Sequence, residues 1–503
     1  MQYEISSLIN GLVEYALDTG LIGNDDAPYC ANSLLALLKL DEYDTAAVPV
    51  KEELPVMLEA VCSFAAQKGL IGNTVTEKDL FDTAVMGVFA ARPSEINSRF
   101  YSLYEQSPEK ATDYFYKFCG DVNYIRRDRV ARMLKWQYGG KYGTIDITVN
   151  LSKPEKDPEE IAKAKLAPAA GYPRCMLCHE NTGYAGRLNF PARQNHRMIT
   201  LSLGGSEWFM QYSPYVYYNE HCIVLEGEHR DMKIDGKTFE RLYDFLDIFP
   251  HYFIGSNADL PIVGGSILNH EHFQGGRYEF AMERAEIEKE LTFEGFPDVE
   301  AGIVRWPMTT VRLRSSDRKQ LAALCEKILA VWRKYEDLDA FIIPFTTDEK
   351  GEEIPHNTIT PIARVKNGRY ETDLVLRNNI TTPEHPLGVY HPHAELHHIK
   401  RENIGLIEVM GLAVLPPRLK TELEALEKAI LTGIDLKADP LTAPHAVWAE
   451  EIIGRYPVIN EENVTDILRK EVGAVFEEVL EHAGVFKRDE KGTAALLKFI
   501  KSV

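Results

Sequence analysis

Hydrophobic residues near the start of the chain recur at three- and four-residue steps, the spacing of a helix with one buried face. They are Ile5, Leu8, Ile9, Leu12, Val13 and Ala16. Gly20 is placed to end this helix, and the sequence GLIGN that begins there is repeated from Gly69. The repeat indicates either a duplicated helix-turn unit or two independent helices that share glycine caps. Helical patterns continue through SEINSRFYSLYEQ and DRVARMLKWQY, so we predict a helical region over residues 1–140.

Short strand patterns replace the helices from Cys175 to about Gly276. The segments MITLSLGG, WFMQYSPYVYYNEHCIVLEG and LPIVGGSILN are rich in Ile, Val, Tyr and Phe. One amphipathic helix is expected between them, in DGKTFERLYDFLDIFPHYF, and strands alternate with helices again up to TDLVLRNN. The tail after Pro417 is helical in pattern. These patterns predict an α+β fold, with two α+β units over residues 141–290 and 291–503 behind the helical region.

Composition narrows the class of protein. A chain of 503 residues, with 45% hydrophobic and 26% charged residues, is typical of a globular protein of about three domains. No apolar run approaches the roughly 20 residues that span a bilayer, and no basic segment precedes the first apolar positions. Seven scattered cysteines favour a reducing compartment, so we expect a cytoplasmic protein without membrane contact. The formal charge of -20 disfavours nucleic acid as a partner.

The richest candidate chemistry lies in DLPIVGGSILNHEHFQGG, which ends at Gly276. On a strand, residues two apart share a face, so His270, His272 and Gln274 project together. A neutral imidazole is a good nucleophile toward phosphorus at pH 7. Gly275 and Gly276 allow a ligand to approach the backbone closely, or a tight turn. A pair of histidines on its own is more often solvated at a strand edge, so two further patterns decide the interpretation.

The first of these patterns is CMLC, where Cys175 and Cys178 have the spacing of half a zinc knuckle. The sequence has no second C-x-x-C, so histidines have to complete any metal site. The second is HCIVLEGEH, an apolar strand bracketed by His221 and His229. Alone, the cysteines suit a redox pair and each histidine suits a solvated strand end. The order of all three patterns is far more specific.

This order resembles the histidine-triad superfamily, in which a strand flanked by two histidines precedes an H-x-H-x-H strand. Gln274 stands where the third histidine would be, as in the nucleotidyl-transferring branch. The segment DLPIVGGSILNHEHFQGG closely resembles the signature of the second family of galactose-1-phosphate uridylyltransferases, apart from Asn269, where a smaller residue is usual. The similarity continues through PRCMLCHENTGYAGRLNFPARQNHR and YHPHAELHHIKRENIGLIEVMGLAVLPPRLK. It implies two histidine-triad-like units with mostly antiparallel sheets.

The resemblance also implies a reaction, the transfer of UMP from UDP-glucose to galactose 1-phosphate in galactose metabolism. His272 would be the nucleophile of a ping-pong cycle, His270 a structural ligand or orienting group, and Gln274 an amide donor to a phosphate oxygen. Residue chemistry agrees, because a phosphate leaving group needs little protonation and a glutamine stabilises charge without readily activating water. The expected partners are a UDP-sugar and a hexose 1-phosphate, with no organic cofactor.

A structural zinc ion is the one cofactor that the resemblance brings in. In the metal-containing members, the ligands would correspond to Cys175, Cys178, His229 and His270, a closed tetrahedral set. His221 is the alternative third ligand, and packed thiols without a metal are the alternative to the whole site.

Arginines and further histidines complete the candidates. Arg187, Arg193 and Arg197 follow the cysteine pair, and planar guanidinium suits phosphate contact, although surface solvation explains each of them as well. Five histidines and a glutamate lie between His385 and His398, enough for a second metal site. We favour substrate binding or structural hydrogen bonds for that segment.

Two other functions stay open from the sequence. A histidine-triad hydrolase or phosphorylase of dinucleoside polyphosphates would be favoured by a third histidine, which Gln274 replaces. A non-catalytic, zinc-stabilised interaction protein would use the helical N-terminal region for docking. The oligomeric state, for which a homodimer is one expectation, and the range of sugar 1-phosphates are not fixed by the sequence.

Overall fold

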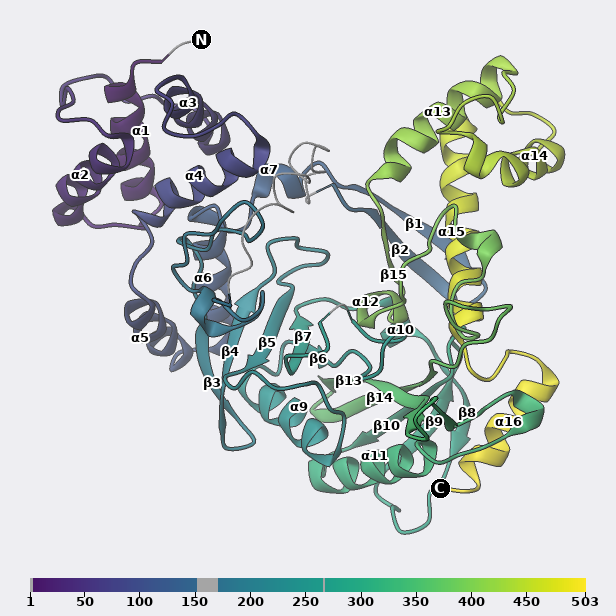
Figure 1. Cartoon of the computed structure of the whole chain (residues 1–503). Coiled ribbons are helices and arrows are strands. Elements are labelled where there is room, and N and C mark those ends of the chain that lie inside the picture. Colours follow the sequence, from purple (N-terminus) through teal and green to yellow (C-terminus); the bar gives the residue numbers. More distant parts are fainter. Residues whose placement is uncertain (1–2, 152–170, 266) are drawn as a thin grey trace.

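The N-terminal helices form a separate bundle at the upper left of Figure 1, in a computed structural model that describes residues 3–151, 171–265 and 267–503. Its helices are α1 (Ile5–Asp18), α2 (Ala27–Leu38), α3 (Leu54–Gln67) and α4 (Val75–Gly87). The predicted helix is confirmed, because Leu8, Leu12 and Ala16 are buried in the bundle core. Gly20 and Gly69 both have positive φ angles, of 74° and 70°, so each GLIGN segment ends its helix in the left-handed conformation that glycine adopts easily.

The next helices connect this bundle to the rest of the chain. They are α5 (Pro93–Tyr104), α6 (Pro108–Asp121) and the short α7 (Arg127–Val130). The helix predicted through DRVARMLKWQY is wrong beyond Val130, because β1 (Leu134–Gly140) pairs with β2 (Gly143–Val149), and β15 (Leu412–Leu415) joins β2 in parallel. Alternate side chains of β1 pack on α15 (Val464–Ala483), where Trp136 donates to the Arg469 carbonyl at 3.1 Å. The side chains of this segment therefore alternate between two faces, as in a strand, and do not follow the three- and four-residue spacing of a helix.

A ten-stranded sheet forms the centre of the molecule, in the order β3-β4-β5-β7-β6-β13-β14-β10-β9-β8. Every neighbouring pair is antiparallel. Helices α9 (Gly236–Ile248) and α11 (Arg318–Trp332) lie along the same side of the sheet, below it in Figure 1. The strands are β3 (Ile199–Leu203), β4 (Ser206–Tyr212), β5 (Cys222–Glu226), β6 (Phe253–Gly255), β7 (His272–Gly276), β8 (Ile287–Leu291), β9 (Glu300–Val304), β10 (Thr310–Ser315), β13 (Asn357–Lys366) and β14 (Arg369–Asn378). The helical N-terminal region and the large antiparallel sheet confirm the predicted α+β class, while the boundaries at residues 140 and 290 stay predictions.

The predicted strand in LPIVGGSILN is wrong. The described residues of this segment form a turn and irregular backbone, with one isolated bridge between Gly264 and Ala258, and β7 begins only at His272. Asp259 holds the start of the turn, since its carboxylate accepts hydrogen bonds from the Ile234 amide at 2.9 Å and from Arg333 at 2.7 Å. The loop is therefore anchored, just before the histidines, to the start of α9 and to the end of α11.

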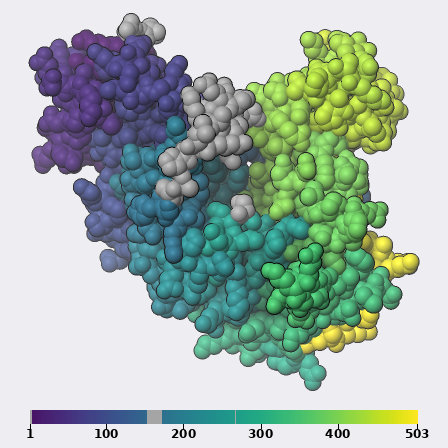
Figure 2. Space-filling view, in the orientation of Figure 1, coloured from purple at the N-terminus to yellow at the C-terminus, as the bar shows by residue number. Residues whose placement is uncertain are grey.

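The remaining elements lie mainly toward the C-terminus. The helical tail after Pro417 is confirmed, and α13 (Arg418–Thr432) and α14 (Ala446–Arg455) form a second lobe at the upper right of Figure 1. In Figure 2 the surface is hollowed between this lobe and the N-terminal bundle. No helix in the described ranges is both long and apolar enough to cross a membrane. The other elements are α10 (Ala281–Arg284), β11 (Phe345–Thr347), β12 (Glu353–Pro355), α12 (Leu406–Val409) and α16 (Glu490–Ile500). Short 3-10 turns lie at Asn24–Asp26, His179–Asn181, Leu338–Ala340, Ala394–Leu396 and Ala443–His445.

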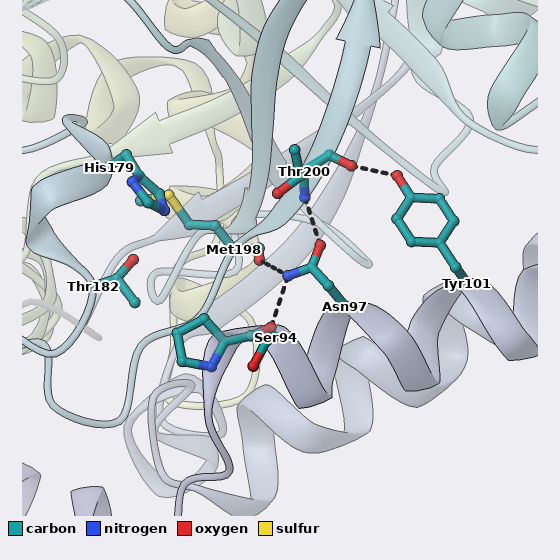
Figure 3. Close-up of a pocket in the computed structure, with 8 residues that line it drawn as sticks. Ser94, Asn97, Tyr101, His179, Thr182, Met198 and Thr200 are labelled. Carbon is teal, nitrogen blue, oxygen red and sulfur yellow. Dashed lines mark hydrogen bonds between the residues drawn. The ribbon is translucent and has the colours of Figure 1, made fainter.

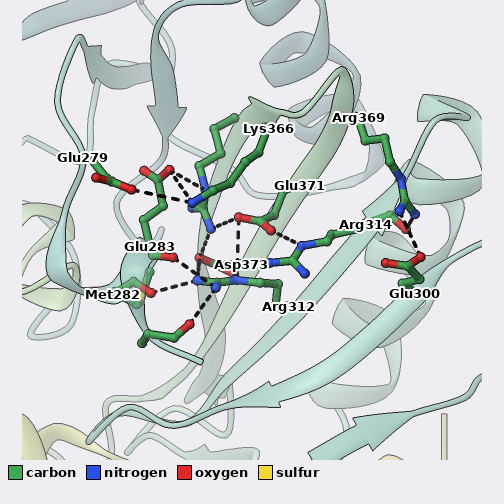
Figure 4. A network of polar contacts seen from close by, with 12 residues as sticks. Glu279, Met282, Glu283, Glu300, Arg312, Arg314, Lys366, Arg369, Glu371 and Asp373 are labelled. Carbon is green, nitrogen blue, oxygen red and sulfur yellow. Dashed lines mark hydrogen bonds and ion pairs between the residues drawn. The ribbon is translucent and has the colours of Figure 1, made fainter. Parts of the chain in front are cut away.

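A buried ion network stabilises the second half of the sheet (Figure 4). Asp373 accepts from Arg312 at 2.6 and 2.9 Å and from Arg364 at 2.9 Å, and all three side chains are at most 5% exposed. Glu371 pairs with Arg364 and with Arg314. Buried charges are tolerated only when they are paired in this way, so the network fixes which strands lie side by side.

Candidate active site

Strand β7 lies between β5 and β6 in the middle of the first half of the sheet. His272 is opposite Leu225, and Gln274 is opposite Ile223 on β5 and Gly255 on β6. The intervening Phe273 points to the other side and stacks on Trp208, with 4.9 Å between ring centroids. The predicted alternation is thus confirmed for β7, and it presents His272 and Gln274 on the face away from this core.

His272 is held as a neutral imidazole with one nitrogen engaged. Its Nδ1 lies 2.8 Å from the carbonyl oxygen of His270, to which it donates. The side chain is 5% exposed, and burial lowers the pKa of His272 to about 4. The lone pair on Nε2 is therefore available at neutral pH, in an orientation that the backbone fixes.

Gln274 is oriented by His221, a buried histidine that lies just before the start of β5. His221 Nε2 lies 3.0 Å from Gln274 Oε1, and His221 is packed on the Tyr218 ring at 4.5 Å. Burial lowers the pKa of His221 to about 4, so the neutral ring donates this hydrogen bond. Because the amide oxygen is occupied, the amide NH2 group of Gln274 is left to donate to a ligand.

Four predicted metal ligands come together beside this strand. Cys175, Cys178, His229 and His270 each offer an atom within 4.8 Å of the others. The Sγ atoms are 3.5 Å apart, His270 Nδ1 is 3.2 and 3.7 Å from them, and His229 Nδ1 is 3.1 Å from that of Cys178. Zinc bonds of about 2.3 Å to sulfur and 2.0 Å to nitrogen place tetrahedral ligand atoms roughly 3.3–3.8 Å apart. The spacing of the four residues fits such an ion.

A carbonyl group orients one of these ligands. His270 Nε2 donates to the Glu226 carbonyl at 2.8 Å, which turns Nδ1 toward the sulfur atoms, as is usual for a metal-bound histidine. His221, the alternative third ligand, points to Gln274 instead. The ring of His270 thus contacts the cysteine cluster, and its carbonyl oxygen accepts a hydrogen bond from His272. One residue therefore links the cluster to the nucleophile.

The three arginines differ in how far they are occupied. Arg197 is 6% exposed and spends four of its five N–H donors on the carbonyls of Ala90, Ala91, Gln194 and His196, so we withdraw it from the phosphate site. Arg187 bonds to Asn189, to the Tyr172 carbonyl and to the Tyr184 hydroxyl. Arg193 donates one N–H to the neighbouring Ala192 carbonyl at 3.1 Å.

The paired glycines are explained by strand packing. A Cβ atom on Gly275 would lie 2.6 Å from the Phe253 carbonyl, and one on Gly276 would lie 2.7 Å from the Glu220 carbonyl. Any side chain here would push the neighbouring backbone away from β7. Packing therefore accounts for both glycines without a ligand.

A surface pocket of about 320 Å³ lies between the start of α5 and β3, and its lining includes His179, the residue after Cys178 (Figure 3). Asn97 bridges its floor by donating to the Pro93 and Met198 carbonyls at 2.9 Å each and accepting from the Thr200 amide at 2.8 Å. His179 on its rim stacks on Phe209. The amide is fully used in joining α5 to the sheet, so we assign this pocket a packing role.

The histidine-rich segment from His385 to His398 divides into two groups. His393 lies with Glu395 and with His482 of α15. His398 Nδ1 is 2.9 Å from His445 Nδ1, and His445 is bonded to Glu422. The sequence did not predict that His482 and His445 lie beside the histidine-rich segment, or that His221 orients Gln274. Each of these contacts joins segments that are distant in sequence, and none follows a recognisable spacing.

Comparisons with known proteins match nearly the whole chain. Residues 22–231 match the N-terminal domain, and residues 245–450 the C-terminal domain, of galactose-1-phosphate uridyl transferase. The galactose-1-phosphate uridylyltransferase of Clostridium acetobutylicum is 51% identical over 498 residues, covering 99% of both chains. That of Halalkalibacterium halodurans is 51% identical over 514 residues, covering 100% of this chain and 99% of its own. Among solved structures, yeast Ap4A phosphorylase Apa2 has 12% identity and a TM-score of 0.30 over 65% of this chain and 92% of its own.

Proposed function

This chain belongs to the galactose-1-phosphate uridyl transferase family, and from that premise we propose that His272 is the residue that carries the uridylyl group. The activity is that of a galactose-1-phosphate uridylyltransferase, a nucleotidyltransferase of galactose metabolism. The substrates are UDP-glucose and galactose 1-phosphate. The roles of individual residues follow from the contacts of β7.

In the first half of the cycle, His272 Nε2 attacks the α-phosphorus of UDP-glucose. A P–N bond forms while the bond from phosphorus to the bridging oxygen breaks, and glucose 1-phosphate leaves with the electron pair. Positive charge develops on the ring, and the His270 carbonyl that accepts from Nδ1 at 2.8 Å stabilises it. The product is a uridylyl-histidine.

In the second half, a phosphate oxygen of galactose 1-phosphate attacks the same phosphorus. The P–N bond breaks, its electron pair returns to Nε2, and UDP-galactose forms. The low pKa of His272, about 4, favours this return because it makes the neutral imidazole a good leaving group. No proton has to be supplied in either half, which suits a site with glutamine in the third motif position.

Gln274 supports both halves by donating its amide NH2 to a non-bridging oxygen of the transferred phosphate. The hydrogen bond from His221 at 3.0 Å prevents the amide from presenting its oxygen to the anion instead. His221 is a positioning residue in this proposal, since it acts through Gln274. A preorganised donor of this kind stabilises charge without activating water.

Arg193 is the phosphate contact we favour, followed by Arg187. Arg193 is bonded through one N–H and lies over the Tyr124 ring at 5.7 Å, so the rest of its planar group can meet a phosphate. Arg187 would first have to release its bonds to Asn189 and Tyr184. Arg197 and the two glycines have no place in this site.

We also propose that Cys175, Cys178, His229 and His270 hold a structural zinc ion. The four ligand atoms have tetrahedral spacing, and two thiolates with two imidazoles leave no open position for substrate. Zinc would supply a rigid cross-link there. Its effect on the reaction is through His270, whose carbonyl oxygen holds the nucleophile.

The contact that carries the proposal is His272 Nδ1 to the His270 carbonyl, because it selects Nε2 as the attacking atom. The test is His272→Gly, assayed for label exchange between UDP-glucose and glucose 1-phosphate, with and without added imidazole. We expect exchange to be abolished and imidazole to restore part of it. His251→Gly is the matched control, because burial also lowers the pKa of His251 to about 4. Undiminished exchange by the His272 variant would place the nucleophile elsewhere.

A further inference from the structure

Two buried carboxylates lie side by side behind the strand of the nucleophile. Glu226 ends β5, Glu271 directly precedes β7, and their side chains are 1% and 5% exposed. The two residues are paired across the strands, since the Glu226 amide donates to the Glu271 carbonyl at 3.0 Å. Because neighbouring residues on a strand point to opposite faces, both carboxylates lie on the α9 side of the sheet and His272 lies on the other.

Arg241 of α9 contacts both carboxylates. Its guanidinium donates to Glu271 Oε1 at 2.9 Å and lies 3.6 Å from Glu226 Oε1, and its side chain is 12% exposed. The same guanidinium lies over the Trp208 ring at 5.3 Å, and that ring stacks on Phe273 of β7. Arg241 is therefore connected to β7 in two ways, through a hydrogen bond and through a stack of two rings.

The peptide group between His270 and Glu271 connects this network to the nucleophile. Its carbonyl oxygen accepts from His272 Nδ1 at 2.8 Å, and its N–H donates to the Arg230 carbonyl at 2.8 Å. The Arg230 side chain in turn binds Glu226. A displacement of Glu271 would therefore turn the carbonyl group that orients the His272 ring.

Stability alone does not account for two carboxylates at these positions. Like charges directly opposite each other on neighbouring strands repel, and a buried charged network gains little over apolar side chains of the same volume. Phe273, two positions after Glu271 and 1% exposed, shows that this side of β7 accepts an apolar side chain. A network of directed hydrogen bonds does fix geometry, and this network lies at the residue next to the nucleophile.

We propose that Arg241 is a positioning residue for uridylyl transfer. By holding Glu271 and Glu226, it fixes the carbonyl group that aims Nε2 of His272 at phosphorus. The inference rests on the role proposed for His272. Arg241 lies on the opposite side of the sheet from that ring, so it acts through the strand and not on the substrate. Misplacing a reacting group by about 1 Å can lower a rate roughly 100-fold, so the loss of Arg241 should slow the chemical step and leave substrate binding unchanged.

The test measures the first turnover of the full-length protein with UDP-glucose and no acceptor sugar. The amplitude of glucose 1-phosphate release counts the folded, competent sites, and the rate constant at saturating UDP-glucose reports the chemical step. Arg241→Met keeps the length of the side chain without its donors. We expect it to keep the amplitude, to lower the rate constant by about 10- to 100-fold, and to change the half-saturating UDP-glucose concentration by less than about twofold.

Two further substitutions show whether the guanidinium contacts matter. Arg241→Lys keeps a charged donor beside Glu271 and should recover about a third or more of the wild-type rate constant. Arg318→Met is the matched control, because Arg318 also binds two carboxylates of α9, Asp244 at 2.9 Å and Asp247, but does so from α11. It should leave the rate constant unchanged.

A double-mutant cycle with Glu271→Ala tests the route of the effect. Because Arg241 acts through Glu271, Arg241→Met should slow the Glu271→Ala protein by less than about threefold. Equal slowing in both backgrounds would overturn the proposal, and so would equal slowing by Arg318→Met.

The remaining outcomes also decide the matter. A wild-type rate constant in Arg241→Met, a loss confined to its amplitude, or no recovery in Arg241→Lys would each overturn the positioning role. His272→Gly, measured alongside, keeps the two proposals distinguishable. Undiminished turnover by His272→Gly would remove the proposed nucleophile, whereas an inactive His272→Gly beside a fully active Arg241→Met would remove only the role of Arg241.

Discussion

Replacing His221 by phenylalanine isolates the hydrogen bond that orients Gln274. His221 is 3% exposed and packs against the Tyr218 ring, so a phenyl ring of similar shape keeps the packing while removing the donor 3.0 Å from Gln274 Oε1. Leaving a buried amide oxygen without its partner costs about 1–3 kcal/mol. If that cost falls on the transition state, kcat/KM decreases by about 5- to 150-fold, at 1.36 kcal/mol for each factor of ten.

The same substitution should barely change stability. The Nδ1 atom of His221 is buried and has no hydrogen-bond partner within the described part of the chain, so phenylalanine removes an unsatisfied polar atom together with the useful donor. The two effects offset each other, and the free energy of unfolding measured in urea should stay within about 1 kcal/mol of the wild type. A loss of activity with unchanged stability separates positioning from folding.

A double-mutant cycle with Gln274→Ala completes this test, with initial rates of UDP-galactose formation as the assay. Because His221 acts through Gln274, His221→Phe should have no further effect once the amide is gone. An equal loss of kcat/KM in both backgrounds would refute this reasoning. So would full activity of His221→Phe in the wild-type background.

Three further predictions concern the nucleophile, the third motif position and the ion network. Burial lowers the pKa of His272 to about 4, so protonation removes the nucleophile only as the pH falls through about 4. We therefore expect kcat/KM to be constant from pH 5 to 8. A decrease in kcat/KM on the acidic side with a midpoint near pH 6.5 would contradict this. Gln274→His should raise the ratio of UMP release to sugar transfer, because it introduces a group able to position water, and an unchanged ratio would count against the role given to Gln274. Asp373→Asn should lower the free energy of unfolding by about 3–5 kcal/mol in urea, because it removes the buried negative charge that Arg312 and Arg364 both contact and leaves them only Glu371. Arg314→Ala, at the 32% exposed rim, should cost less than about 1 kcal/mol, and equal effects of the two variants would show that burial does not set the cost.

Local patterns predicted those parts of the molecule that depend on residues close together in sequence. The apolar stripe of α1, its glycine cap and the alternation along β7 follow from spacing alone. The resemblance to the histidine-triad superfamily also gave the four metal-ligand candidates, which come from three segments and lie together in the fold.

Long-range pairing decided the rest. Leu134–Gly140 is a strand because it pairs with β2, and β2 pairs with β15 from much later in the chain, which no local period reveals. Arg197 has the composition of a phosphate ligand, yet the carbonyls of Ala90 and Ala91, more than 100 positions earlier, occupy it. His221 gained its role from the pairing of β5 with β7, which brings it to Gln274.

The central claim is that His272 carries the uridylyl group, and trapping that group tests it most directly. The wild-type protein is incubated with UDP-glucose labelled in the α-phosphate, without any acceptor sugar, and its peptides are mapped by mass spectrometry. The account predicts one uridylyl group on His272 for each glucose 1-phosphate released, its discharge as UDP-galactose on adding galactose 1-phosphate, and no adduct in His272→Ala. An adduct on another residue, or turnover without any adduct, would contradict the account.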